Sequence, residues 1–307
     1  MQIYLPIADM PVNVFLVLAM GLAVGFLSGM FGVGGGFLMT PLLIFIGISP
    51  AVAVASVSPQ ITASLFTGFL NYWRRRSIDF ALGTMLLLGG VGGTVVGVWL
   101  FTLLRALDQL DLAIGLAYVT LLTSVGALMI AEGVRAELRA RSGRPAILRR
   151  PGSHNWLHGL PLKLRFKRSK IYVSAVPVWG IGFLIGFLSA VLGVGGGFLL
   201  VPMLIYFLRV PTATVIGTSM MLTLVTMASA TIMHAATNHL VDAVLAVFLM
   251  VGGVIGAQFG AQAAHRMRDE RLRLLLGLLV FGVGMRFAYD LVVSPEDLFS
   301  LRHVRAG

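Results

Sequence analysis

The sequence predicts an all-α polytopic membrane protein made of two homologous repeats, each of about four long helices plus a broken or re-entrant segment. Three observations predict this fold class. The chain of 307 residues is 58% hydrophobic and only 11% charged, with a mean hydropathy of +0.94, whereas soluble domains are about 45–50% apolar and about 25% charged. Apolar runs long enough to span a bilayer recur along the chain, and one glycine-rich motif occurs twice.

The apolar runs take up almost the whole chain, so no separate soluble domain fits. A bilayer core requires about 20 apolar residues per spanning helix. Eight runs reach this length, at residues 12–48, 50–73, 80–104, 110–131, 171–208, 211–236, 241–264 and 272–293.

The first and fifth runs are too long for one upright helix. The first has 37 residues and would measure about 55 Å as a helix, against a hydrocarbon core of about 30 Å. Each of the two runs holds a glycine cluster near its middle, at Gly32–Gly36 and at Gly193–Gly197. Because a glycine costs roughly 1 kcal/mol relative to alanine inside a helix, we expect both helices to break there.

The glycine clusters belong to a duplicated motif. Residues 25–41, GFLSGMFGVGGGFLMTP, align with residues 186–202, GFLSAVLGVGGGFLLVP, at a constant offset of 161 with 12 identities in 17 positions. After a slip of two residues, Asn71 matches His234 and Asp79 matches Asp242 at an offset of 163. Two later glycine ladders also match, namely Gly89, Gly90, Gly93 and Gly97 with Gly252, Gly253, Gly256 and Gly260.

The duplication predicts a first repeat at 12–132, a connecting loop at 133–170, a second repeat at 171–293 and a C-terminal tail at 294–307. The loop holds eleven Lys or Arg residues against one Glu, so it supplies +10 of the net charge of +11. Short basic loops between apolar segments lie on the cytoplasmic side. We therefore expect a multi-pass protein of the cell (inner) membrane with this loop in the cytoplasm, near anionic lipid headgroups. A nucleic-acid partner is not expected, because few aromatic residues interleave with the charge.

Flanking charges favour an inverted arrangement of the two repeats. In the first half, Arg74, Arg75 and Arg76 precede the run 80–104. In the second half the basic residues follow the matching run 241–264 instead. Equivalent ends then face opposite sides, which requires an odd number of crossings per half and makes the piece after each glycine cluster a short fifth crossing or a re-entrant half-helix. A plain four-plus-four arrangement is the alternative, because loop charge biases orientation without fixing it.

Helices that break at glycines suggest how this chain could bind a small anion. A break leaves backbone N–H groups unpaired and places the positive end of a half-helix dipole inside the membrane. Almost no Lys or Arg lies within the apolar runs to do this instead. Close helix packing is the alternative role for such glycines, and it is the favoured one for the two later ladders. The candidate substrate-binding glycines are Gly34, Gly35, Gly36, Gly195, Gly196 and Gly197.

Uncharged polar side chains in the runs that follow supply further candidates. Ser58, Gln60, Thr218 and Ser219 are interpreted as substrate-binding donors, since hydroxyls and amides can donate to anion oxygens and cost less to bury than a charge. In the alignment of the two halves, Gly217-Thr218-Ser219 matches Ser56-Val57-Ser58. The same side chains can instead bond to their own helix backbone.

Asn71 and His234 occupy matching positions near helix ends and are candidates for coupling or gating. His234 could carry a coupling proton, although a satisfied polar contact is the favoured interpretation. Asp79 and Asp242 each open a helix, where an N-cap role explains them.

Several functions are excluded by what the sequence lacks. Cysteine is absent, which removes disulfides and thiolate chemistry. No phosphate-binding P-loop, HExxH motif or histidine cluster is present, so we expect neither an enzyme nor a metal or cofactor site. Arg286 is the main cation within a run, and it precedes Asp290 by four residues, which favours a local ion pair over a transport role.

The duplicated motif, the Gly217-Thr218-Ser219 triplet, the stretch from His234 to Asp242 and the glycine ladders resemble the TauE/SafE sulfite exporter family, also called the toluene sulfonate uptake permeases. The resemblance covers residues 12–293. It implies a secondary carrier for sulfite, organosulfonates or related small sulfur-containing anions, without ATP hydrolysis. Two alternatives stay open, namely a carrier or channel for another small anion or metabolite, and a membrane scaffold that acts through its basic loop.

Overall fold

The computed structural model describes residues 2–31, 34–74, 76, 78–141, 163–166, 169, 171–208, 210, 212–264 and 269–293. Gly32 and Val33, most of the predicted loop and the predicted C-terminal tail lie outside this part of the chain. The described residues form α1 (Val14–Phe31), α2 (Gly36–Phe45), α3 (Pro50–Arg74), α4 (Phe80–Ala106), α5 (Leu110–Arg141), α6 (Ala175–Leu192), α7 (Gly197–Tyr206), α8 (Thr212–Met233), the π-helix η2 (His234–Asn238), α9 (Ala243–Ala264) and α10 (Asp269–Val292). They also form four short strands, β1 (Gln2–Leu5), β2 (Met10–Asn13), β3 (Lys163–Phe166) and β4 (Ile171–Ser174).

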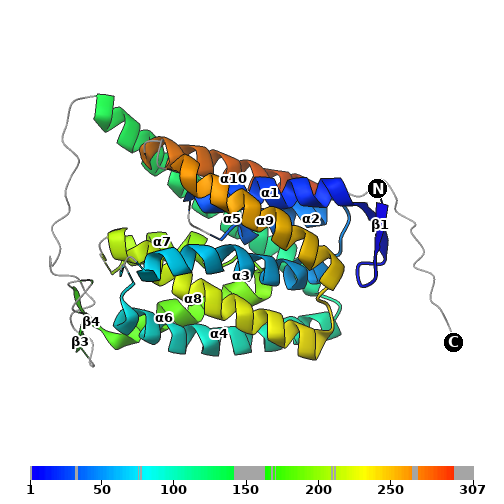
Figure 1. The fold of residues 1–307 in the computed structure, drawn as a ribbon, viewed down its shortest axis with the longest axis horizontal. Coiled ribbons are helices and arrows are strands. Elements are labelled where there is room, and N and C mark those ends of the chain that lie inside the picture. The colour runs from blue at the N-terminus through cyan, green and yellow to red at the C-terminus, as the bar shows by residue number, and fades with distance from the viewer. Residues whose placement is uncertain are drawn as a thin grey trace.

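The all-α membrane fold is confirmed. The helices run roughly along the longest axis of the molecule (Figure 1). Within the described residues, six helices are long and apolar enough to cross a membrane by length and composition, at Pro50–Arg74, Phe80–Ala106, Leu110–Arg135, Ala175–Leu192, Thr214–Asn238 and Ala243–Ala263. Large apolar side chains cover their outward faces, among them Leu88 and Trp99 of α4, which are 60% and 64% exposed. Such a surface suits contact with lipid.

Both over-long runs break at their glycine clusters, as predicted. The first run divides into α1 and α2, and the fifth divides into α6 and α7. Gly34, Gly35, Gly193 and Gly195 have φ angles of 92°, 65°, 65° and 70°, a region that residues with a Cβ seldom adopt. The helices α2 and α7 have 10 residues each and are about 15 Å long, so neither spans a bilayer core alone.

Each half pairs its helices with those of the other half. The helix α1 packs along α9, α4 along α6, α3 along α8, and α5 along α10. The glycine ladders make the first two contacts possible. A Cβ on Gly25 would lie 2.3 Å from the carbonyl oxygen of Gly253, and a Cβ on Gly186 would lie 1.9 Å from that of Gly90. The packing interpretation of the ladders is therefore confirmed.

A two-stranded antiparallel hairpin lies at the start of each half, a feature that the sequence pattern does not predict. β1 pairs with β2 between Gln2 and Asn13, and β3 pairs with β4 between Lys163 and Ser174, so the two hairpins share the offset of 161. They lie at opposite ends of the molecule (Figure 1). The last turns of α5 and the strand β3 fall within the range 133–170, and β4 begins directly after it at Ile171.

Two buried aspartates hold these hairpins and begin helices, which confirms their expected capping role. Asp79 Oδ1 accepts a hydrogen bond from the Leu82 N–H at the start of α4, and its Oδ2 accepts from the Ser169 N–H and hydroxyl in the turn between β3 and β4. Asp242 Oδ1 accepts from the first N–H groups of α9, and its Oδ2 accepts from the Ile7 and Ala8 N–H groups in the turn between β1 and β2. Each aspartate therefore anchors the hairpin of the other half.

The sequence offset between equivalent residues of the two halves rises from 161 to 163 in two steps of one residue each. Ser56 Oγ accepts the Asp242 N–H at 2.9 Å, and Thr218 Oγ1 accepts the Asp79 N–H at 3.2 Å. These two hydroxyls make equivalent contacts and are 162 positions apart. Ser56 therefore corresponds to Thr218 and not to Gly217, with which the sequence alignment pairs it. The second step coincides with η2, because a π-helical turn accommodates one extra residue.

Candidate functional site

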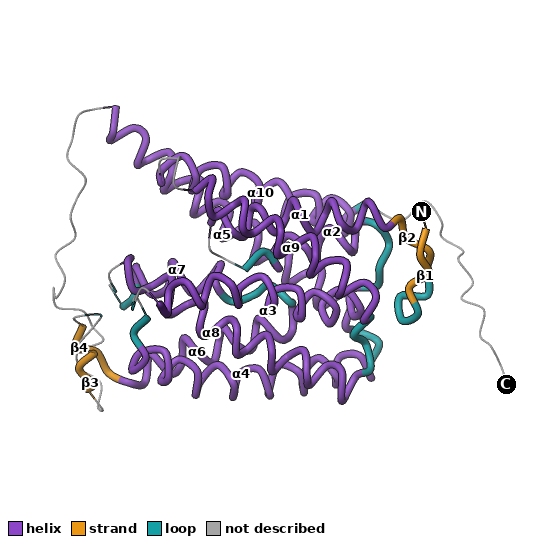
Figure 2. Tube along the Cα trace, in the orientation of Figure 1, coloured by secondary structure: helices purple, strands orange, loops and turns teal. Residues whose placement is uncertain are grey.

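The two glycine breaks meet each other in the interior of the molecule. Figure 2 shows them as short loops among the helices. A Cβ on Gly36 would lie 2.3 Å from the Gly193 carbonyl oxygen, and one on Gly195 would lie 3.5 Å from that of Gly34. The side chain of Ile61 on α3 fills the space beside them, since its Cδ1 would lie 2.4 Å from the same Cβ on Gly36. The structure thus brings both sets of candidate glycines together.

A symmetric aromatic contact marks the centre of this meeting point. Phe37 and Phe198 are the second residues of α2 and α7 and occupy equivalent positions in the repeat. Their rings stack with centroids 4.6 Å apart and planes 12° apart, and both side chains are buried. The N-terminal turns of the two half-helices therefore lie side by side.

The half-helices α2 and α7 start without a side-chain cap. Their N-cap residues, Gly35 and Gly196, offer no side chain to accept from the first N–H groups. The first N–H groups of a helix have no acceptor within it, and the helix dipole adds positive potential at the same point. At α2 the Gly36 N–H already donates to the Gly34 carbonyl at 2.8 Å and the Leu38 N–H to the Gly35 carbonyl at 3.1 Å. Among the described residues, the first N–H groups of α7 have no such acceptor, so α7 presents the freer hydrogen-bond-donating end inside the bundle.

Two hydroxyls that are not among the candidates from the sequence, those of Ser189 and Thr223, lie at the start of α7. A Cβ on Gly196 would lie 3.2 Å from Ser189 Oγ and 3.6 Å from Thr223 Oγ1. Ser189 is 1% exposed and Thr223 is 0% exposed, and neither hydroxyl has a hydrogen-bond partner among the described residues. In the first half, Ser28 takes the place of Ser189, 3.4 Å from a Cβ on Gly35. One signal was available, because the duplicated motif has serine at its fourth position in both halves.

The predicted hydroxyl donors are engaged elsewhere. Ser58 Oγ donates to the Val54 carbonyl at 3.1 Å, Thr218 Oγ1 to the Thr214 carbonyl at 2.7 Å, and Ser219 Oγ to the Ile216 carbonyl at 2.8 Å. These bonds stay within each residue's own helix. In this arrangement their protons are not directed at a ligand.

Gln60 is buried between α3 and α9. Its side chain is 1% exposed, and its Oε1 has no hydrogen-bond partner among the described residues. Its Nε2 would lie 2.7 Å from a Cβ on Gly253. Gln60 thus lies on α3 one residue before Ile61, and it faces the α9 glycine ladder.

His234 lies in a satisfied polar contact. Its Nε2 donates to the Ala190 carbonyl at 3.0 Å, and its Nδ1 accepts from Asn238 Nδ2 at 3.2 Å; this tautomer follows from the two partners. The Asn238 Oδ1 accepts from the Thr102 hydroxyl, and the ring of Phe101 meets the imidazole edge-on at 4.6 Å. The side chain of Asn71, the matching gating candidate, lies outside the described part of the chain.

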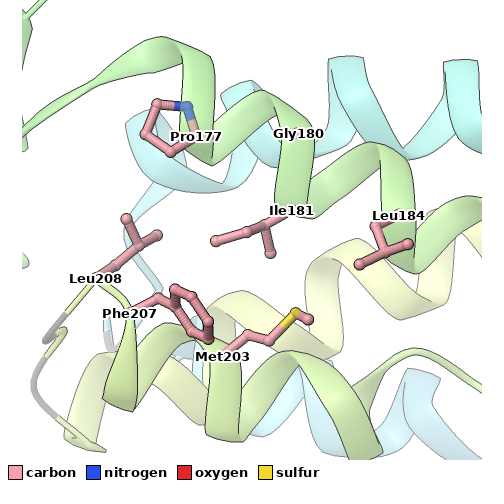
Figure 3. Close-up of a pocket in the computed structure, with 7 residues that line it drawn as sticks. All are labelled: Pro177, Gly180, Ile181, Leu184, Met203, Phe207 and Leu208. Atoms are coloured by element: carbon pink, nitrogen blue, oxygen red, sulfur yellow. The ribbon is translucent and has the colours of Figure 1, made fainter. Parts of the chain in front are cut away.

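A separate cavity lies between α6 and α7 (Figure 3). Its volume is about 400 Å³, and its lining is apolar: Pro177, Gly180, Ile181, Leu184, Met203, Phe207 and Leu208. A lining of this kind offers an anion no donors. The candidate anion site is therefore the glycine meeting point and not this cavity.

Comparison with known proteins shows that the chain is similar to bacterial proteins named as probable membrane transporters. A probable membrane transporter protein of Xylella fastidiosa (strain 9a5c) is 31% identical over 273 residues, which cover 85% of this chain and 90% of that protein. The probable membrane transporter protein YjnA of Bacillus subtilis (strain 168) is 27% identical over 273 residues, covering 88% of this chain and 98% of YjnA. No solved structure matches.

The relatives are named as transporters and not as enzymes, which agrees with the expectation from the motifs. The model of the family described as sulfite exporter TauE/SafE matches residues 17–287, nearly the whole chain. The chain belongs to the sulfite exporter TauE/SafE family, a family of membrane transporters.

Proposed function

We propose that this protein is a secondary transporter of a small sulfur-containing anion, such as sulfite or an organosulfonate, bound where the two glycine breaks meet. One observation carries this proposal: two uncapped half-helix N-termini lie side by side inside the bundle. Helix N-termini in broken membrane helices bind anionic groups of substrates in this way. No lysine or arginine is among the buried residues that the structure describes, so the backbone is the main source of positive potential.

The two halves act as inverted repeats in this proposal. The hairpins at opposite ends of the molecule (Figure 1) and the exchanged helix pairs support it. We keep the division into repeats at 12–132 and 171–293 and add the hairpins 2–13 and 163–174, which share the offset of the duplicated motif. Rocking of one half against the other would open the central site to each side in turn.

The orientation in the membrane follows from the charge of the connecting segment. Its excess of Lys and Arg supports a cytoplasmic position in a cell (inner) membrane. The second hairpin would then lie at the cytoplasmic side and the first at the opposite side.

Flux measurements on purified protein in liposomes test the proposal. Uptake of labelled sulfite, taurine, sulfate and acetate is compared, with and without an imposed pH gradient. We expect saturable uptake of a sulfur-containing anion that its chemical relatives inhibit. Folded protein that carries none of these anions would contradict the proposal.

Glycine substitutions then localise the site. Gly196→Val should abolish flux, because its Cβ would lie 2.2 Å from Ile185 Cγ2 and the added side chain would cover the first turn of α7. Gly282→Val is the matched control, since nothing lies within 4 Å of a Cβ there. A monodisperse elution profile in detergent shows that each variant is folded.

The basic loop offers a second candidate function, a membrane scaffold. Substitution of the eleven Lys and Arg residues of 133–170 with Gln separates the two functions, because a scaffold that acts through this charge loses its activity while a transporter keeps its flux. Unchanged flux in liposomes after these substitutions supports the transporter.

A further inference from the structure

Ser189 and Thr223 are two of the buried polar side chains near the glycine breaks that have no hydrogen-bond partner among the described residues; Thr40 beside Gly193 and the Gln60 Oε1 are others. A buried hydroxyl without a hydrogen-bond partner is costly, and most hydroxyls in this bundle avoid that cost by bonding to their own helix. Thr226, one turn after Thr223 on α8, does so through the Leu222 carbonyl at 2.9 Å. Ser189 and Thr223 have no such partner among the described residues, although both are buried.

Both hydroxyls face the start of α7. They come from α6 and α8, and both lie within 4 Å of the position that a Cβ on Gly196 would take. The Cγ2 methyl group of Ile185 lies 2.2 Å from the same position, so this side chain must turn aside when a ligand binds. Gly196 is the N-cap of α7, a helix of 10 residues without a side-chain cap. Two side-chain donors and the free N–H groups of the first turn therefore meet at one point. Hydroxyl and N–H donors together suit the oxygen atoms of an oxyanion.

The first half does not repeat this arrangement in full. Ser28 matches Ser189, but the residue that matches Thr223 on α3 is Ile61, at the offset of 162 that the aspartate contacts define. Ile61 fills the space against Gly36 and Gly195. An oxyanion would accordingly bind on the α7 side of the meeting point.

The donors at this point are all uncharged. Desolvation of an ion in a low-dielectric interior costs several kcal/mol, and this cost grows with the square of the ionic charge. No lysine or arginine is among the buried residues described, so in this part of the chain no buried cation offsets the second charge of a dianion.

We infer that Ser189, Thr223 and the N-terminus of α7 form the oxyanion subsite, and that this subsite selects singly charged oxyanions over doubly charged ones. The inference rests on the proposed transport function and assigns its substrate class. A sulfonate, with one charge spread over three oxygens, fits this subsite, whereas sulfate does not.

The test compares two isosteric substitutions on one helix. Thr223→Val and Thr226→Val each replace a hydroxyl with a methyl group, and wild-type and variant proteins are reconstituted in liposomes at neutral pH. Uptake of labelled methanesulfonate, which carries one charge, is measured against labelled sulfate, which carries two. We expect wild-type uptake of methanesulfonate to be saturable and insensitive to excess sulfate. Loss of one hydrogen bond to a charged ligand should raise KM about tenfold in Thr223→Val, and Thr226→Val should retain the wild-type KM.

The outcomes separate the two proposals. Wild-type protein that is folded but carries no anion contradicts the transport function and this inference with it. Wild-type uptake of methanesulfonate with an unchanged KM in Thr223→Val overturns the subsite alone. Uptake of sulfate as fast as methanesulfonate overturns the selectivity for single charge. Ser189→Ala gives an independent second variant, for which we expect the same direction of change in KM, with Ser28→Ala less affected.

Discussion

The carboxylate of Asp242 accepts the backbone N–H of Ile7 at 2.9 Å, although 235 positions separate them in the chain. Its counterpart Asp79 accepts the N–H of Ser169 at 2.9 Å. Each contact fixes a hairpin of one half to the first turn of a helix in the other half. The two aspartates thus fix one hairpin at each end of the molecule, and the two glycine breaks lie between these ends.

Asp242→Ala should lower the stability of the protein by about 2 kcal/mol or more, because it removes a helix cap and leaves buried N–H groups without acceptors. Thermal unfolding in detergent, followed by tryptophan fluorescence, measures the change. Asp290→Ala is the control: Asp290 pairs with Arg286 at 3.1 Å in an exposed i,i+4 ion pair, which is worth less than about 1 kcal/mol. Equal shifts in the two variants would contradict the anchoring role of Asp242.

A Cβ in the helix contact between α4 and α6 should be far more damaging than one on the outer surface. In Gly93→Ala the new atom would lie 2.0 Å from the Phe183 carbonyl oxygen, so the two helices must separate. Gly282→Ala meets nothing within 4 Å and should gain up to about 1 kcal/mol from helix propensity. The melting temperatures of the two variants should therefore move in opposite directions from that of the wild type.

The lack of cysteine makes the inverted arrangement directly testable. Pro6→Cys in the turn between β1 and β2 and Tyr172→Cys in β4 place single thiols at exposed positions of the two hairpins. In intact cells, a maleimide that cannot cross the membrane should label the first variant. The second should react only after permeabilisation, and the cysteine-free parent should not react. Labelling of both variants from the same side would argue for the plain four-plus-four arrangement.

His234→Gln should leave the response of transport to a pH gradient intact. Both ring nitrogens of His234 already have partners within the bundle, and a glutamine amide can replace one of these contacts at a stability cost of about 1–2 kcal/mol. Flux with and without a pH gradient measures the response. A variant that transports but has lost all dependence on the gradient would restore the coupling role of His234.

The broken helices could be predicted because three consecutive glycines act locally, through backbone freedom that no contact needs to supply. The roles of the hydroxyls could not be predicted in this way. Ser58 and Thr223 both lie inside apolar helices, yet Ser58 bonds to its own backbone and Thr223 does not. The difference depends on which neighbouring helix each side chain faces, and that is set by packing between halves.

The hairpins were missed for a related reason. Strands of four residues carry little periodicity, and β3 and β4 lie within or next to a stretch read as a charged loop. The turn between β3 and β4 is held by Asp79, which is far away in the chain and accepts the Ser169 N–H. The single-residue steps of the repeat were likewise hidden, because only the hydrogen bonds of Ser56 and Thr218 show where each step occurs.

Because α1 packs against a helix of the other half, it lacks its packing partner while the chain is being synthesised. The glycine face of α1, including Gly25, packs against α9, which begins at Ala243. At translation rates of about 5–20 residues per second, α1 must wait roughly 10–40 s for its partner to leave the ribosome. During that interval the glycine face of α1 is in contact with lipid or with the insertion machinery. Neither half is therefore expected to mature alone, and a ribosome that stalls before α9 should yield a product marked for proteolysis.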